Sequence, residues 1–318
     1  MKTAEILDRL RALRVLVVGD ICLDRWCRYD PAEALPSAET GIPRVAVTSV
    51  EVTPGAGGTI ANNLAALGVG QISVVGVVGR DGFGWELRQA LAERGIDGSR
   101  LVEAAGVQTF TYTKVINGET GEEDRPRLDF IMNRPLGADV ERALLAQLDG
   151  EWDAIIVSDQ AETAAGGVVT PAVREAIRGK LVWVDSRARA EHFRGVILKP
   201  NEQEATEACR RAFGEVDFAR LREWTASPLL LVTHGGRGAR LYTAEGDTWV
   251  ATRPVEMPVD ICGAGDSFTA GAVCALAVTG HQVRAAQFGN QVAAITIMKP
   301  GTGTASPEEL LRDAHDRD

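Results

Sequence analysis

The chain has 318 residues, of which 45% are hydrophobic and 25% are charged, and its formal net charge is −10. This acidic balance argues against a nucleic-acid-binding protein, because neutralising many phosphates requires a concentrated lysine and arginine surface. No apolar stretch reaches the roughly 18 residues that a membrane span needs, and charges interrupt the N-terminus where a signal peptide would be apolar, so we expect a cytoplasmic protein that acts on small molecules.

Taken in chain order, short apolar runs rich in β-branched residues alternate with amphipathic stretches. The runs predict strands at residues 15–18, 72–78, 154–158, 181–185, 196–198 and 229–233. The other stretches predict helices at residues 59–67, 84–94, 139–148, 171–178, 202–212 and 267–277. Parallel strands need crossover connections and are buried on both faces. We therefore predict an α/β fold with a mostly parallel sheet flanked by helices, formed by a single domain over residues 1–318.

Two segments, at about 23–52 and 107–132, break this alternation. Residues 44–52 and 109–116 have the alternating pattern of exposed strands, and a polar turn follows the second run at 117–123. We interpret them as one small β-sheet that projects as a flap. Such a flap could close over a substrate, or form a homodimer by edge pairing. The alternative is an extra antiparallel edge on the main sheet, since mixed sheets are common.

The strongest signal for catalysis is the sequence Asp-Ile-Cys-Gly-Ala-Gly-Asp at 260–266, which leads directly into a predicted helix. The N–H groups of Gly263, Ala264 and Gly265, together with the helix dipole, could stabilise charge on a phosphoryl group during its transfer. Asp266, in the first helical turn, could accept the proton of an attacking hydroxyl. The alternative is that Asp266 only caps the helix, which is a common role for aspartate.

Two familiar phosphate sites are absent from the sequence. The P-loop pattern does not occur, and the first strand is not followed by the Gly-x-Gly-x-x-Gly of dinucleotide-binding domains. The strand at 229–233 ends in a glycine turn, where ligands enter at the carboxyl edge of a parallel sheet, although turn chemistry alone would also explain these glycines. Asn201 and Glu204, which follow the strand at 196–198, fit either a helix capping box or a site for hydrated Mg²⁺.

Acidic residues and glycines near the N-terminus suit a polyhydroxylated ligand. Asp20 ends the first strand, Asp24 follows shortly after, and the sequence Pro-Gly-Ala-Gly-Gly at 54–58 precedes a predicted helix. A carboxylate can accept two sugar hydroxyls at once, and bare backbone lets a ring come close. Asp20 fits equally well as an ordinary cap at the end of a strand.

Taken together, these motifs resemble the ribokinase-like (PfkB) carbohydrate kinase family across nearly the whole chain. Residues 260–268 resemble its C-terminal signature, residues 54–68 its N-terminal glycine signature, residues 79–84 its Gly-x-Asp-x-x-Gly turn, and residues 199–204 complete the set. The resemblance implies a three-layer α/β/α fold in which the flap is a substrate lid. It also implies a sugar kinase that uses ATP, Mg²⁺ and a monovalent cation such as K⁺.

The resemblance also implies roles for individual residues. Asp266 would be the catalytic base, beside an anion hole at 263–265. The other implied residues are the substrate ligands Asp20, Asp24, Gly55, Ala56, Asn63 and Asp129, and the ATP-binding residues Asn201, Glu204, Thr233, Gly235, Gly238 and Asn290, of which Glu204 would also hold Mg²⁺ through water.

Within this family, the chain is most similar to the heptose-phosphate kinases that form one half of a bifunctional protein of ADP-heptose synthesis. The likeness lies at residues 19–26, 37–43, 127–130, 157–159 and 299–306, and the chain ends before any nucleotidyltransferase domain. Departures occur at the sugar end, where Ala56 replaces a glycine, Thr59 stands where the sugar-binding asparagine is expected unless Asn62 serves, and Gln160 and Glu162 replace a tyrosine and a lysine. A third departure is Asp-Ser-Arg at 185–187, which replaces Asp-Pro-Lys.

We therefore predict transfer of the ATP γ-phosphoryl group to a sugar or sugar phosphate, with D-glycero-D-manno-heptose 7-phosphate as one acceptor. The alternatives are another hydroxyl compound, such as a hexose, ribose or nucleoside, and a non-catalytic sugar or nucleotide sensor.

Overall fold

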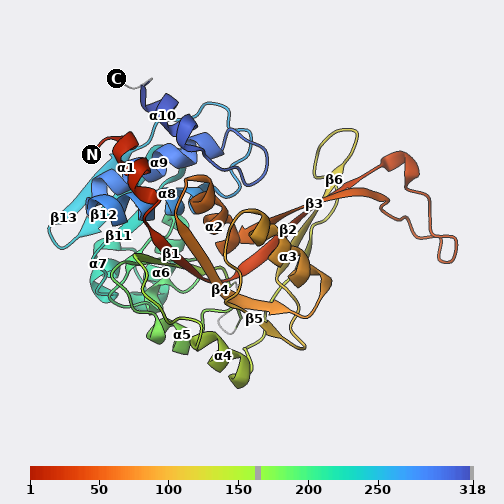
Figure 1. The fold of residues 1–318 in the computed structure, drawn as a ribbon, viewed down its shortest axis with the longest axis horizontal. Helices are drawn as coiled ribbons and strands as arrows, with labels where there is room; N and C mark the ends of the chain where they lie inside the picture. Colours follow the sequence, from red (N-terminus) through yellow and green to blue (C-terminus); the bar gives the residue numbers. More distant parts are fainter. Residues whose placement is uncertain (162–165, 316–318) are drawn as a thin grey trace.

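The computed structural model describes residues 1–161 and 166–315. Its main sheet has the strand order β13-β12-β11-β10-β9-β8-β1-β4-β5, and its strands are parallel except for the antiparallel pairs that β12 makes with β11 and β13 (Figure 1). The strands are β1 (Arg14–Gly19), β4 (Gln71–Gly79), β5 (Leu101–Ala104), β8 (Ala154–Asp159), β9 (Val182–Ser186), β10 (Ile197–Leu198), β11 (Leu230–Thr233), β12 (Gly238–Thr243) and β13 (Gly246–Ala251).

Helices cover both faces of this sheet because its strands are apolar on both sides. In β1, Val15 and Val17 enter one buried core, whereas Leu16 and Val18 enter the other. The first core is covered by α1 (Thr3–Leu10), α2 (Gly57–Ala66), α3 (Gly82–Glu93), α8 (Ala264–Thr279), α9 (Gln282–Thr296) and α10 (Pro307–His315). The second is covered by α4 (Ala138–Leu145), α5 (Pro171–Ala176), α6 (Glu202–Phe213) and α7 (Phe218–Trp224). The predicted helix–sheet–helix fold is confirmed.

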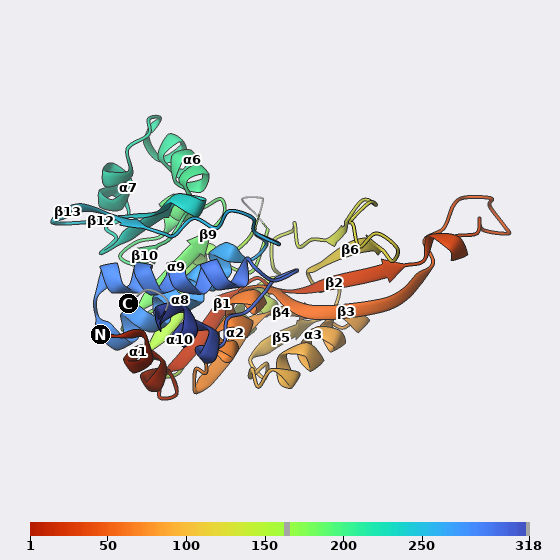
Figure 2. The ribbon, with the colours of Figure 1, turned by 90° about the horizontal axis from the view of Figure 1, so that it is seen from above.

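A second sheet projects from this body, as Figure 2 shows. It has the order β3-β2-β6-β7 and consists of β2 (Ile21–Tyr29), β3 (Val47–Ala56), β6 (Thr111–Asn117) and β7 (Leu128–Phe130). We call this sheet the lid. It confirms the small sheet predicted at 23–52 and 107–132 and excludes the alternative of an extra edge on the main sheet. Helix α3 supports its base through a 2.9 Å ion pair between Arg25 and Glu86.

None of the helices in the described part of the chain is long and apolar enough to cross a membrane.

Candidate active site

The glycine turn before α8 brings backbone close to several side chains. Gly263 has a φ of 77°, which favours glycine. A Cβ atom at this position would lie 3.3 Å from methyl carbons of both Thr59 and Thr302. Any larger residue at position 263 would therefore fill the space between Thr59 and Thr302 at the start of α8.

Asp266 lies in the first turn of α8, as predicted, and is half-buried. Burial, followed by the charges of Asp185 and Asp24, raises its pKa to about 8, although Lys199 opposes this rise. A carboxyl group with such a pKa can take up and release a proton near neutral pH. This favours the catalytic interpretation of Asp266 over the capping one, and α8 has no side-chain cap bond at its N-terminus.

The predicted anion hole is only partly available. The amide of Ala264 donates to the carbonyl of Ile261 at 3.2 Å, because the chain closes a tight turn there. Among the described residues, no carbonyl accepts the amide hydrogens of Gly263 or Gly265. Of the three amides predicted to face an anion, that of Ala264 is thus occupied within the turn, and those of Gly263 and Gly265 have no carbonyl partner among the described residues.

A buried lysine stands beside this turn. The Lys199 ammonium forms a 2.8 Å ion pair with Asp185, and a Cβ atom on Gly265 would lie 3.5 Å from it. Burial alone would lower the pKa of Lys199, but the carboxylates of Asp185, Glu204 and Asp266 raise it. The sequence motif contains Lys199, yet its role was not predicted, since only folding brings it to the start of α8.

Asn201 and Glu204 form the capping box that the sequence allowed. The Asn201 side chain accepts from the Glu204 amide at 2.9 Å, and the Glu204 carboxylate accepts from the Asn201 amide at 2.8 Å. Burial and the charge of Asp185 raise the pKa of Glu204. Within the described residues, no group of three or more His, Cys, Asp or Glu side chains could hold a metal ion. A directly ligated metal cage is therefore not formed here.

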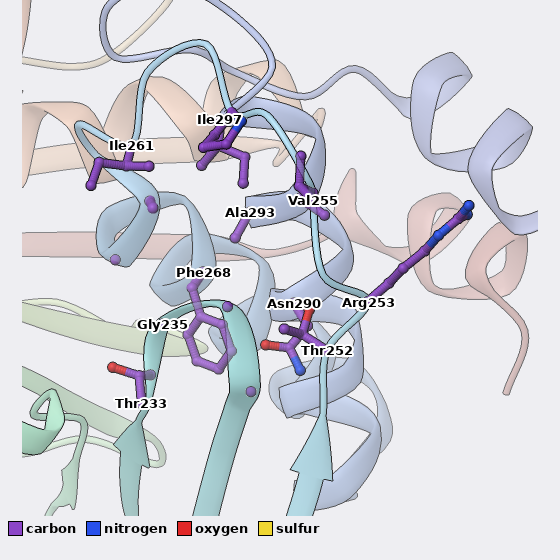
Figure 3. Close-up of a pocket in the computed structure, with 16 residues that line it drawn as sticks. Thr233, Gly235, Thr252, Arg253, Val255, Ile261, Phe268, Asn290, Ala293 and Ile297 are labelled. Atoms are coloured by element: carbon purple, nitrogen blue, oxygen red, sulfur yellow. The ribbon is translucent and has the colours of Figure 1, made fainter.

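A cavity of about 340 Å³ lies between the end of β11 and helices α8 and α9 (Figure 3). It is lined by four of the residues predicted to surround the nucleotide, Thr233, Gly235, Gly238 and Asn290, together with Ala264 and Gly265 of the catalytic turn. Its apolar walls were not predicted, because side chains such as Phe268 and Ile297 resemble ordinary helix core in the sequence. Its mostly apolar lining suits a nucleotide base.

Most of the residues predicted to bind the sugar lie on the lid and in the turn before α2. A Cβ atom on Gly55 would lie 2.5 Å from a carboxylate oxygen of Asp24, so glycine is required for Asp24 to occupy its place. Burial raises the pKa of Asp24 to about 6, and Lys114 and Arg127 oppose this rise. Asp129 lies on β7 in an ion pair of 2.7 Å with Arg127.

Two predicted substrate ligands are buried instead. Asp20 is 2% exposed, and its two oxygens accept from the amides of Gln160 and Val168, each at 2.8 Å. Asn63 is fully buried and donates to the carbonyl of Thr59 at 3.0 Å. Both side chains therefore hold neighbouring backbone, and their role as substrate ligands stays a prediction.

The departures at Ala56 and Thr59 fall in this region, whereas Asp185, in the departure at 185–187, pairs with Lys199 beside the catalytic turn. Thr59 is buried and donates to the carbonyl of Pro54 at 3.4 Å, whereas Asn62 is half-buried. Ala56 begins α2 at a φ of 51°, a backbone region that favours glycine. Glu162 lies outside the described residues.

Comparisons with known proteins agree with this geometry. The model of the pfkB family of carbohydrate kinases matches residues 12–309. The bifunctional protein HldE of Trichlorobacter lovleyi is 30% identical over 96% of this chain, but the chain spans only 64% of that relative's length. Ribokinase from Thermotoga maritima has a TM-score of 0.71 at 21% identity, covering 96% of this chain and 100% of its own. Phosphofructokinase-2 from Escherichia coli, in complex with potassium, has a TM-score of 0.72 at 20% identity, covering 96% and 99%.

The motifs, the ribokinase-like fold and the match over nearly the whole chain lead to one conclusion: the chain belongs to the pfkB family of carbohydrate kinases and is a phosphotransferase with a hydroxyl acceptor.

Proposed function

We propose that the chain transfers the γ-phosphoryl group of ATP to a hydroxyl of a sugar or sugar phosphate, with Asp266 as general base. The observation that carries this proposal is the position of Asp266. It is adjacent in sequence to Gly265, which lines the nucleotide cavity, and it is within electrostatic range of Asp24 at the sugar end. Phosphoryl transfer needs its base between the two substrates.

In the proposed reaction, Asp266 accepts the proton of the acceptor hydroxyl while the hydroxyl oxygen bonds to the γ-phosphorus. The bond from this phosphorus to the bridging oxygen breaks, and ADP leaves with the electron pair. The free amides of Gly263 and Gly265, the α8 dipole and the Lys199 ammonium all favour negative charge on the group in transfer.

Magnesium fits the residues beside the nucleotide cavity. Mg²⁺ usually keeps several waters and is held by one or two carboxylates together with substrate phosphates. Glu204 uses one oxygen in its capping bond with Asn201, which leaves its second oxygen for a metal-bound water. When bound, the ion would offset charge on the phosphates. Potassium is a further candidate ion, because one structural neighbour was solved in complex with it.

For the acceptor, the similarity to HldE makes a heptose 7-phosphate the first candidate. Hexoses, ribose and nucleosides are the alternatives, because Thr59 and Gln160 change the sugar end of the site. We also propose that the chain forms a homodimer through the lid.

Replacing Asp266 tests the proposed reaction. ADP formation would be measured against a panel of sugars and sugar phosphates with wild type, Asp266→Asn and Asp8→Asn. We expect Asp266→Asn to lower kcat about 100-fold to 10,000-fold, because the base is lost. Asp8→Asn, an exposed change on α1, should keep wild-type activity.

Binding of a non-hydrolysable ATP analogue, followed by calorimetry, would show that Asp266→Asn still folds. Unchanged turnover in this variant would disprove the role of Asp266. Binding of nucleotide and sugar by wild type with no ADP formed from any acceptor would instead support a sensor.

A further inference from the structure

The lid presents two different faces along β2 and β6. Arg25 points toward α3, where it contacts Glu86 and stands 4.7 Å from the ring of Phe83. Asp24 and Trp26, which alternate with Arg25, therefore point to the opposite face. Register pairs Asp24 with Tyr112 and Trp26 with Lys114, so these four side chains share that face.

This face meets the catalytic loops. A Cβ atom on Gly301 would lie 3.4 Å from the Trp26 indole, and the amide of Gly301 donates to Asp260, at the start of the catalytic motif, at 3.1 Å. Burial raises the pKa of Cys262, immediately before the anion hole, and the charge of Lys114 opposes this rise. The Lys114 ammonium is therefore within electrostatic range of the turn that leads into α8.

Lys114 differs from the other cations around the site. Arg25, Arg127 and Lys199 each form an ion pair with a carboxylate. The Lys114 ammonium lies 4.2 Å from the ring centre of Trp26, and no carboxylate of the described chain lies within ion-pair distance of it. Lys114 is half-buried, so its charge is partly removed from water; it is stabilised by the aromatic face of Trp26 and, beyond ion-pair distance, by the carboxylate of Asp24.

A ligand anion would supply the missing partner, and ATP is poorly placed to do so. The nucleotide cavity is lined by residues of the β11 end, α8, α9 and the loop between β13 and α8, and none of its lining residues belongs to the lid. The acceptor, which the lid faces, is therefore the better placed source of this anion. Family membership leaves the charge of the acceptor open, since the structural neighbours are named a ribokinase and a phosphofructokinase.

We propose that Lys114 binds an anionic group of the acceptor, and that it selects phosphorylated over neutral sugars. This inference rests on the proposed kinase function and adds a residue that determines specificity. Arg127 stands 4.7 Å from the ring of Tyr112 on the same sheet, so it adds positive charge beside Lys114 while remaining paired with Asp129. The acceptor hydroxyl would point to Asp266, and its phosphate ester would point to the lid.

Matched acceptors test this inference. The pairs are ribose and ribose 5-phosphate, fructose and fructose 6-phosphate, and sedoheptulose and sedoheptulose 7-phosphate. We expect wild type to prefer the phosphorylated member of at least one pair. Lys114→Met should lower kcat/KM for that member about 10-fold or more, because a charge-assisted contact contributes about 1.5–3 kcal/mol. Its effect on the neutral member should stay below about 3-fold. Lys114→Arg should restore most of the preference. Lys180→Met, which changes an exposed lysine elsewhere, should leave kcat/KM unchanged for both members of the pair.

Calorimetry of the same sugar phosphates, without nucleotide, measures binding independently of turnover. Weaker binding by Lys114→Met, restored by Lys114→Arg, would support the inference even if no transfer were detected. Equal losses of kcat/KM by Lys114→Met for both members of a pair would overturn the role of Lys114 while the kinase proposal stands. A wild type that prefers neutral sugars would do the same. Wild type that forms no ADP from any acceptor would count against the kinase proposal instead.

Discussion

Charge around Asp266 is balanced by a small number of buried groups. Lys199 is held by Asp185 at 2.8 Å and lies beside Gly265, so its positive charge is directed toward the turn that receives the phosphoryl group. Asp185 also accepts from Thr269 at 3.3 Å, which fixes the carboxylate against α8. Two carboxylates, Asp185 and Asp24, raise the pKa of Asp266 and two cations, Lys199 and Arg187, lower it, so burial is the largest cause of its raised pKa.

The raised pKa of Asp266 predicts a dependence of activity on pH. A base must be deprotonated, and a pKa of about 8 leaves most Asp266 carboxyls protonated at pH 7. We expect kcat/KM to rise with pH and to level off above about 8, since kcat/KM reports the free enzyme. The measurement is a pH profile of kcat/KM at constant ionic strength.

Stability should show the opposite trend, which serves as a control. An aspartate whose folded pKa is raised from 3.8 favours the folded state while protonated, and this contribution is lost as pH rises toward about 8. Asp266→Asn cannot ionise, so its Tm relative to wild type should increase between pH 5 and pH 8.5. A flat activity profile, together with no such increase, would contradict the raised pKa.

Roles that follow from the order of residues in a motif could be predicted from the sequence, and roles that depend on folding could not. Asp266 and Gly263 lie within four residues at the start of α8, so the sequence alone predicts that they lie close together. Lys199 and Phe268 join the site only through packing of β10 and α8. The burial of Asp20 depends on the loop after β8, whose amides it accepts, and the sequence gives no sign of this contact.

At the scale of elements, the start of α2 is strained. Its N-cap, Ala56, has a φ of 51° and a ψ of −119°, where a Cβ atom is unfavourable. Ala56 pairs with Ile21 at the base of the lid, next to Gly55, which makes room for Asp24. The substitution of alanine for the usual glycine therefore places strain where the lid joins the main body.

Ala56→Gly should relieve this strain. Backbone strain of this kind costs about 1–3 kcal/mol, and glycine loses about 0.5–1 kcal/mol more backbone entropy on folding than alanine. We expect a net gain of about 1 kcal/mol in the free energy of unfolding, measured by urea denaturation. Ala66→Gly, the same change at the last residue of α2, is the matched control and should destabilise the protein. Equal destabilisation by both changes would show that Ala56 is not strained.

Elements with strong periodicity were predicted, and those without it were missed. Residues 15–18 and 72–78 are continuous β-branched runs, so β1 and β4 are evident in the sequence. The hairpin of β12 and β13 was missed because β13 is mostly exposed and contains Asp247 and Thr248. Helix α9 was missed because its polar residues, such as Gln291, are buried by packing against α8 and α10.

The connection from β8 to α5 shows how buried charge holds an element in place. Arg189 forms a buried ion pair with Asp159 and donates to the carbonyl of Gly166 at 3.1 Å. Asp20 accepts from Gln160 and Val168 at the two described ends of the same connection. Removing one member of a buried pair leaves the other charge uncompensated, so these positions tolerate little change.

At the scale of the whole molecule, the lid extends far beyond the body that supports it (Figures 1 and 2). Its β3 strand lies at the edge of a four-stranded sheet, and the connection from β2 to β3 forms an extended arm. Leu35 and Ile42 on this arm are each 64% exposed, and Val45 and Val47 are also exposed. An apolar arm beside an open sheet edge is a surface that monomers usually protect.

A second copy of the chain is the partner that we expect on this surface. Wild type should sediment as a dimer, and the double variant Leu35→Asp, Ile42→Asp should weaken self-association about 100-fold or more, because charges replace apolar contacts on both copies. Val216→Asp changes an exposed apolar residue on the main body and should leave the dimer intact. Sedimentation equilibrium across a range of concentrations measures this difference. A monomeric wild type, or equal effects of the arm and control variants, would exclude the arm as the dimer interface.

Because the arm continues directly into β2 and β3, which carry Asp24 and Gly55, loss of the dimer should also raise KM for the acceptor more than KM for ATP.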